Sequence, residues 1–188
     1  MSLKFHEMTI DAYLSALGSM APAPGGGAAA GLIGAQACAL GEMVSRLSSS
    51  RKNTDDFREK AEQYAAIFES ARSIFLDLMD EDAKNFCELM ALLQSPRDSA
   101  DTKRKEKLEA AFKKSAEAPY QMADAMSELL PAFTQLLLHC NKNVITDAVI
   151  AAEQAISCIR AARLNVEINA KYVKDKFYAR EMKDSYLT

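Results

Sequence analysis

The sequence contains no tryptophan, only two histidines, five prolines and seven glycines among its 188 residues. So few helix breakers, and no run in which β-branched and polar residues alternate, argue against a sheet and favour long helices. The AVILMFWYC set makes up 49% of the chain and charged residues 26%, a balance typical of a globular domain rather than of disorder. With no repeat or linker visible, we expect one all-α domain over residues 1–188.

The sequence also has no excess of positively charged residues. The chain has 23 Lys and Arg residues against 26 Asp and Glu residues, for a net charge of −3, so it lacks the field that attracts nucleic acids. No early apolar stretch reads as a signal peptide, and no uninterrupted run of about 18–20 apolar residues reads as a membrane span. We expect a cytoplasmic protein that binds neither nucleic acid nor membrane.

Metal-binding patterns are absent from the sequence as well. The cysteines have no CxxC spacing and fall within helical patterns, where we expect buried free thiols: Cys38, Cys87, Cys140 and Cys158. A di-iron bundle needs Glu-x-x-His pairs, and neither His6 nor His139 has a glutamate at that offset. We therefore predict no metal and no cofactor beyond a substrate.

Capping residues and the few prolines divide the first half of the chain into helices. Thr9 is an acceptable N-cap for a helix that runs to Gly18, and a second helix should extend from the Gly25–Gly27 triplet to about Ser48. Thr54 and the acids after it predict the start of a third helix, of about 40 residues and 60 Å. Because a compact chain of this size has a radius of gyration of about 16 Å, such a helix should overhang it and be covered by a second copy.

The second half of the chain predicts three further helices. They extend over about 101–139, with a bend or break near Pro119 and Pro131, then about 146–171 after a turn at 141–143, and about 173–183. The expected fold is an up-and-down bundle of long helices with a Gly/Ala-rich packing seam, completed by homodimerisation.

Small residues line one face of the second helix in alternating steps of four and three: Gly27, Gly31, Gly34, Cys38, Gly41, Ser45 and Ser48. Each interior glycine costs about 1 kcal/mol relative to alanine, so this face predicts a neighbouring helix at close range. The triplet Gly25–Gly27 differs because it begins the helix, where free amides suit an anionic or carbonyl-bearing ligand. It is not a P-loop, since no Gly-Lys-Ser/Thr follows.

An aspartate interrupts the apolar stripe of the third helix. Phe68, Phe75, Asp82 and Leu89 follow one another in steps of seven. A carboxylate on an inward face must be paired, hydrogen-bonded or used in chemistry, because burial disfavours its charge and raises its pKa. Asp82 is therefore either half of a buried salt bridge or a catalytic group, whereas its neighbours Asp80 and Glu81 are expected to be solvated.

The fifth helix carries a second aspartate, Asp147, in its first turn. Acids are favoured there by the helix dipole, so capping alone could explain Asp147. Asn165 lies about 27 Å further along the same helix at 1.5 Å per residue. The two ends of this helix therefore cannot meet at one reacting atom within a chain, unless an elongated ligand or a second chain connects them.

Four segments, in this order and spacing, resemble the cyclodeaminase/cyclohydrolase family. They are Pro-Ala-Pro-Gly-Gly-Gly at 22–27, Leu-Met-Asp-Glu-Asp-Ala-Lys-Asn-Phe at 78–86, Thr-Asp-Ala at 146–148 and Asn-Val-Glu-Ile-Asn at 165–169. The resemblance extends over residues 5 to 176. The Pro-x-Pro-Gly-Gly-Gly segment is its most specific part, and the Asn-x-x-x-Asn segment the least specific.

The resemblance implies an all-α homodimer that acts on a one-carbon derivative of tetrahydrofolate. The folate would carry a tail of one or several glutamates. A cyclodeaminase closes formimino-tetrahydrofolate to methenyl-tetrahydrofolate, and a cyclohydrolase opens the methenyl ring with water. Asp82 would be the general acid/base and Asp147 the second carboxylate. Substrate-binding residues would be Pro24, Gly25, Gly26, Gly27, Thr146 and Lys174, the last of them facing the glutamate tail.

The sequence departs from the family pattern at two places. Ala28 replaces the usual serine after the triplet, and Thr146 and Val149 replace the serine and the glycine of the usual Ser-Asp-Ala-Gly segment. Two alternatives therefore stay open beside an enzyme: a folate-binding relative without activity, and a non-catalytic helical oligomerisation module. The latter predicts that Asp82 is paired with a Lys or Arg of the same chain and has no cavity beside it.

Overall fold

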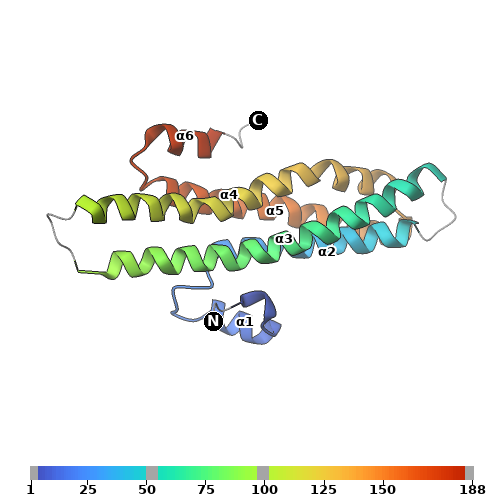
Figure 1. The fold of residues 1–188 in the computed structure, drawn as a ribbon. Helices are drawn as coiled ribbons and strands as arrows, with labels where there is room; N and C mark the ends of the chain where they lie inside the picture. The colour runs from blue at the N-terminus through green and yellow to red at the C-terminus, as the bar shows by residue number, and fades with distance from the viewer. Residues whose placement is uncertain (1–3, 50–54, 97–101, 185–188) are drawn as a thin grey trace.

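The computed structural model describes residues 4–49, 55–96 and 102–184, and it contains helices and no strand within those ranges. The elements are the 3₁₀ turn η1 (Phe5–Glu7), α1 (Ile10–Leu17), α2 (Gly26–Ser49), α3 (Asp55–Gln94), α4 (Thr102–His139), the 3₁₀ turn η2 (Lys142–Val144), α5 (Ile145–Ala170) and α6 (Lys176–Asp184). Figure 1 shows α2 to α5 side by side as an up-and-down bundle, with α1 and α6 outside it. The all-α prediction is confirmed.

The helix boundaries follow local chemistry. The Thr9 hydroxyl accepts a hydrogen bond from the Ala12 amide and caps α1, as predicted. The predicted cap at Thr54 lies outside the described residues. The last helix begins at Lys176, three residues later than the sequence pattern indicated.

Helix α2 is the centre of the bundle and contacts α3, α4 and α5. By length and composition it is apolar enough to cross a membrane, but 56% of its most apolar 18-residue window is buried inside the protein. Its apolar character is thus explained by its central position. The facing side of α5 is lined by alanines, so α2 and α5 form the predicted seam of small residues: Ala148, Ala151, Ala155 and Ala162 are all buried.

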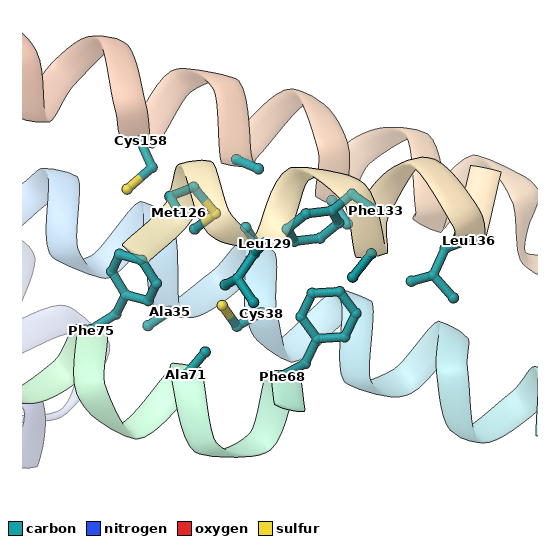
Figure 2. Close-up of a cluster of buried hydrophobic side chains, with 14 of the residues drawn as sticks. Ala35, Cys38, Phe68, Ala71, Phe75, Met126, Leu129, Phe133, Leu136 and Cys158 are labelled. Carbon is teal, nitrogen blue, oxygen red and sulfur yellow. The ribbon is translucent and has the colours of Figure 1, made fainter. Parts of the chain in front are cut away.

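The glycines of α2 receive the large side chains of α3 in a matched sevenfold register. A Cβ on Gly41 would lie 3.0 Å from the Phe68 ring, and one on Gly34 would lie 2.5 Å from the Phe75 ring. Because α2 and α3 are antiparallel, moving seven residues back along α2 reaches the residue that lies opposite a position seven residues further along α3. Figure 2 shows Phe68 and Phe75 projecting from α3 into the core beneath α4. The ring centroids of Phe68 and Phe133 lie 4.7 Å apart there, with the ring planes tilted by 45°.

Helix α3 is as long as predicted, but its length does not require a second copy. Helix α4 is nearly as long, with 38 residues against 40, and lies beside α3, so the monomer is elongated rather than compact (Figure 1). Helix α4 also continues through Pro119 and Pro131; of the bend or break that the prolines suggested, the break does not occur. Of the four cysteines, Cys87 is exposed and not buried as expected.

Candidate functional site

A pocket of about 140 Å³ lies where α2 begins, between α3, α4 and α5. It is lined by Ala23, Gly25, Gly26, Gly27, Asp82, Ala83, Phe86, Ser115, Asn165, Ile168 and Asn169. The pocket therefore brings together the glycine triplet, Asp82 and the C-terminal end of α5. It combines an apolar wall with a few convergent polar groups, which is the usual form of a small-molecule site.

Asp82 occupies the next position of the sevenfold register after Phe75. A Cβ on Gly27 would collide with all three atoms of the Asp82 carboxyl group, so only glycine lets this carboxylate lie on α2. Burial raises the pKa of Asp82 to about 6, and a hydrogen bond from the Ala28 amide opposes the shift only in part. Among the described residues no ion pair involves Asp82, so the buried salt bridge, the alternative left open by the sequence, does not form.

Asp80, two residues earlier, was predicted to be solvated, but its carboxylate is bound by the N-terminal segment. Its Oδ1 accepts a hydrogen bond of 2.8 Å from the Phe5 amide, and its Oδ2 lies 2.6 Å from His6 Nδ1. Asp80 thereby ties the N-terminal segment to α3. Glu81 is exposed, as expected.

These hydrogen bonds of Asp80 hold a small second hydrophobic core against the outer side of the site. Tyr13 of α1 packs there with Ala28, Met79 and Ala83 and is 4% exposed. Burial and the nearby charge of Asp82 raise the pKa of Tyr13. The segment before α2 thus shields the Asp82 region from solvent.

The polar groups on the α5 side of the pocket are held by a chain of hydrogen bonds. The Asn165 side-chain amide donates to the Ala161 carbonyl at 2.8 Å. The Asn169 amide donates to the carbonyls of Ser115 and Asn165 at 2.9 and 3.0 Å. The Ser115 hydroxyl donates to the Asn85 carbonyl at 3.4 Å. These bonds connect α3, α4 and α5 around the pocket.

The other predicted site residues divide into two groups. Gly25, Gly26 and Gly27 line the pocket, and Pro24 is buried directly beside them. Lys174 does not line it; the lysine lies in a separate, shallow hollow with Lys105, Lys113, Glu106 and Glu109.

Thr146 and Asp147 lie in the first turn of α5, at the opposite end of the bundle from the pocket. Thr146 is exposed and Asp147 half-buried. The structure therefore brings Asp82 together with the glycine triplet, but not with Asp147 of the same chain.

Sequence reasoning missed Phe86, Ser115, Asn165 and Asn169 as pocket residues. The spacing of Asn165 and Asn169 put them on one face of a helix, but nothing in the sequence indicated which residues that face meets. Within the described part of the chain, no three His, Cys, Asp or Glu side chains cluster as metal ligands would.

The fold and the pocket together define a class: an all-α bundle in which one desolvated carboxylate faces a glycine-rich helix start. Residues 9–187 match the formiminotransferase-cyclodeaminase family, and the chain belongs to that family.

Individual relatives are similar over nearly the whole chain. A methenyltetrahydrofolate cyclohydrolase of Methylorubrum extorquens is 31% identical over 175 residues, which are 92% of this chain and 84% of that protein. A formimidoyltransferase-cyclodeaminase of Rattus norvegicus is 24% identical over 174 residues, but the matched part is 32% of its length. The crystal structure of formiminotetrahydrofolate cyclodeaminase from Thermotoga maritima aligns with a TM-score of 0.86 and 26% identity, covering 95% of this chain and 86% of that one.

The raised pKa of Asp82 predicts that this residue destabilises the fold at neutral pH. Below the usual pKa of 3.8 the carboxyl is protonated in both the folded and unfolded states; above about 6 it is ionised in both, and folding must then desolvate a charge. The contribution of Asp82 to the free energy of unfolding thus becomes unfavourable as the pH rises from 4 to 6. The loss is roughly 2–3 kcal/mol, at about 1.4 kcal/mol per unit of difference between the folded and unfolded pKa.

Asp82→Asn cannot ionise, so it should be more stable than the parent by that amount at pH 7.5 and by about a third of that amount at pH 4.5. Urea unfolding at the two pH values measures the difference. A parent that is as stable as Asp82→Asn at pH 7.5 would contradict the desolvated carboxylate. Glu81→Gln, which removes an exposed neighbouring charge, serves as the control.

Proposed function

We propose that this chain is an enzyme that forms or hydrolyses 5,10-methenyltetrahydrofolate, as a formimidoyltetrahydrofolate cyclodeaminase, a methenyltetrahydrofolate cyclohydrolase or both. The observation that carries this proposal is Asp82, an unpaired carboxylate with a pKa of about 6 at the wall of a pocket. The substrate is suggested by the names of the relatives, which are a cyclohydrolase and cyclodeaminases.

Both reactions exchange a group on a carbon that is bonded to two nitrogens. In hydrolysis, a water oxygen bonds to the methenyl carbon and becomes the formyl oxygen, and one carbon–nitrogen bond breaks. Of the two protons that water loses, one reaches the departing nitrogen and the other is released, because a cation gives a neutral product. In cyclodeamination, the folate nitrogen that closes the ring bonds to the formimino carbon. The bond from that carbon to the terminal nitrogen then breaks, and this nitrogen leaves as ammonia. Either step needs one group that can accept a proton and return it nearby.

Asp82 suits this role in two ways. A general acid/base works best when its pKa lies near the working pH, and burial moves the pKa of Asp82 in that direction. The ionised form also attracts the cationic, amidinium-like carbon in a site from which water is partly excluded. An ordinary surface aspartate would have too low a pKa to return the proton efficiently.

The remaining contacts to substrate follow from the shape of this end of the bundle. The amides of Gly25, Gly26 and Gly27, beside Pro24, would hold a polar group of the folate. Lys174, which follows the C-terminal end of α5 and shares its hollow with two lysines and two glutamates, would meet the glutamate tail. No metal is assigned a role.

A homodimer is the second part of the proposal, and the outward side of α5 supports it. That side exposes apolar residues along its whole length: Ile145, Val149, Ile156, Leu164 and Ile168 are 37–66% exposed. Such a stripe on a soluble helix is typical of an interface. Ile168 also lines the pocket, so the stripe continues to the site.

The charges within this stripe are arranged for pairing with an antiparallel copy. Glu153 and Arg160 lie equally far on either side of the Ile156–Ser157 bond, as do Val149 and Leu164. A twofold axis at that bond would place Glu153 opposite Arg160 of the second copy and apolar residues opposite one another. It would also bring the first turn of the second α5, with Thr146 and Asp147, to the pocket end of the first.

The folate reaction is tested by the methenyl-tetrahydrofolate absorbance. We expect the purified protein to consume this signal faster than the spontaneous rate, or to generate it from formimino-tetrahydrofolate. Asp82→Asn should lower the rate by about 100-fold or more, as expected for loss of a general acid/base, whereas Glu81→Gln should leave it unchanged.

The alternatives give different results in the same assay. Folate binding without turnover would identify an inactive relative, and neither binding nor turnover would identify an oligomerisation module. Turnover that is equal in Asp82→Asn and the parent would reject Asp82 as the acid/base.

The dimer is tested by exchanging charges on α5. Glu153→Arg alone and Arg160→Glu alone each place like charges opposite each other twice per dimer. Because exposed pairs contribute about 0.2–1 kcal/mol each, either change should weaken dimerisation by roughly tenfold. The double variant should restore it, as measured by sedimentation equilibrium. Equal dimerisation of all four proteins, or no recovery in the double variant, would exclude this register.

A further inference from the structure

Both asparagines of the pocket have their amide nitrogens committed to backbone carbonyls. Asn169 has two N–H hydrogens, and its Nδ2 bonds to two acceptors, the carbonyls of Ser115 and Asn165. The Asn165 nitrogen bonds to the Ala161 carbonyl. The side-chain atom that Asn169 can offer to a ligand is therefore its carbonyl oxygen, which only accepts hydrogen bonds, whereas Asn165 offers its carbonyl oxygen and one remaining N–H.

The position of Asn169 depends on a proline in α4. In an unbroken α-helix the amide of residue 119 would donate to the Ser115 carbonyl, but Pro119 has no N–H. The Ser115 carbonyl is thus left without its helical partner, and Asn169 of α5 supplies the donor instead, at 2.9 Å. Pro119 is itself fully buried, so this link between α4 and α5 lies inside the bundle.

Asn165 and Asn169 line the pocket opposite the start of α2. The Asn165 side chain faces Gly26: a Gly26 side chain would lie 3.3 Å from its Oδ1 and 3.5 Å from its Nδ2. Asp82, on α3, lines the same pocket. The side chains of this pocket consequently present one carboxylate and two neutral acceptors. Both N–H groups of Asn169 and the Ser115 hydroxyl are used elsewhere, and one N–H of Asn165 remains as a donor.

We propose that Asn165 and Asn169 are specificity-determining residues whose carbonyl oxygens bind the N–H groups of an amidinium-type cation held beside Asp82. The assignment of that cation to a folate one-carbon unit rests on the proposed function. A formimino group carries N–H hydrogens on its terminal nitrogen, whereas both ring nitrogens of a methenyl unit are fully substituted. The acceptor wall therefore favours binding of the formimino group.

The inference is tested with two probes of equal size, formamidinium and formate, added separately to the parent protein. Formamidinium has only donors and a positive charge; formate has only acceptors and a negative charge. For ligands of three heavy atoms we expect a dissociation constant no tighter than about 1 mM for formamidinium, and binding of formate at least tenfold weaker. Chemical-shift changes of pocket residues measure both without any turnover.

Variants then identify the residues that bind the probe. Asn169→Leu and Asn165→Leu should each weaken formamidinium binding by about tenfold, the effect of one hydrogen bond to a charged group. Asp82→Asn should weaken it as well. Gln63→Leu, a comparable change at an exposed side-chain amide of α3 that does not line the pocket, should have no effect. Circular dichroism checks that each variant is folded.

Two results would overturn the inference: formate binding as strongly as formamidinium in the parent, or folded asparagine variants that bind formamidinium like the parent. Either can occur while the folate assay still shows turnover. Conversely, discrimination between the probes without turnover would reject the proposed reaction and keep the acceptor wall.

Discussion

The close approach of α2 and α3 is the contact on which the rest of this structure depends. Three glycines of α2 lie directly beneath Phe68, Phe75 and Asp82 of α3, each a step of seven from the next. At two positions the contact buries an aromatic ring and stabilises the bundle. At the third, the same geometry buries a carboxylate against Gly27, which destabilises the charged form and creates a functional group. Stability and function thus come from one repeated contact.

The surroundings of Asp82 maintain this state rather than relieve it. The Ala28 amide at the start of α2 donates to the carboxylate, but burial outweighs that bond and the pKa remains raised. Asp80 binds His6 and the Phe5 amide and so keeps the N-terminal segment over this region. On the far wall, the carbonyl that Pro119 leaves free holds Asn169 in place. The site is therefore assembled from four parts of the chain, each with a separate structural reason.

The helices, the glycine face and Asp82 could be predicted because each is a local pattern: a period, a cap or an acid within an apolar stripe. The distance between Asp147 and Asn165 also followed from helical rise alone. Which faces meet could not be predicted in this way. Asp80 was expected in solvent because its partner, His6, lies over 70 residues away, and the pocket role of Asn169 depends on a contact with another helix. The length of α3 suggested that a second copy must cover this helix. The sequence could not show that α4 of the same chain lies along α3 and covers it.

The most direct test of this account is the titration of Asp82 itself, followed by the ¹³C chemical shift of its side-chain carboxyl carbon in the folded protein. The account predicts a midpoint at about 6 in the parent, because ionisation must occur in a partly desolvated pocket where none of the described residues forms an ion pair with Asp82. A midpoint near the ordinary value of 3.8 would mean that the carboxylate is well solvated or paired. The acid/base role proposed for Asp82 would then lose its physical basis.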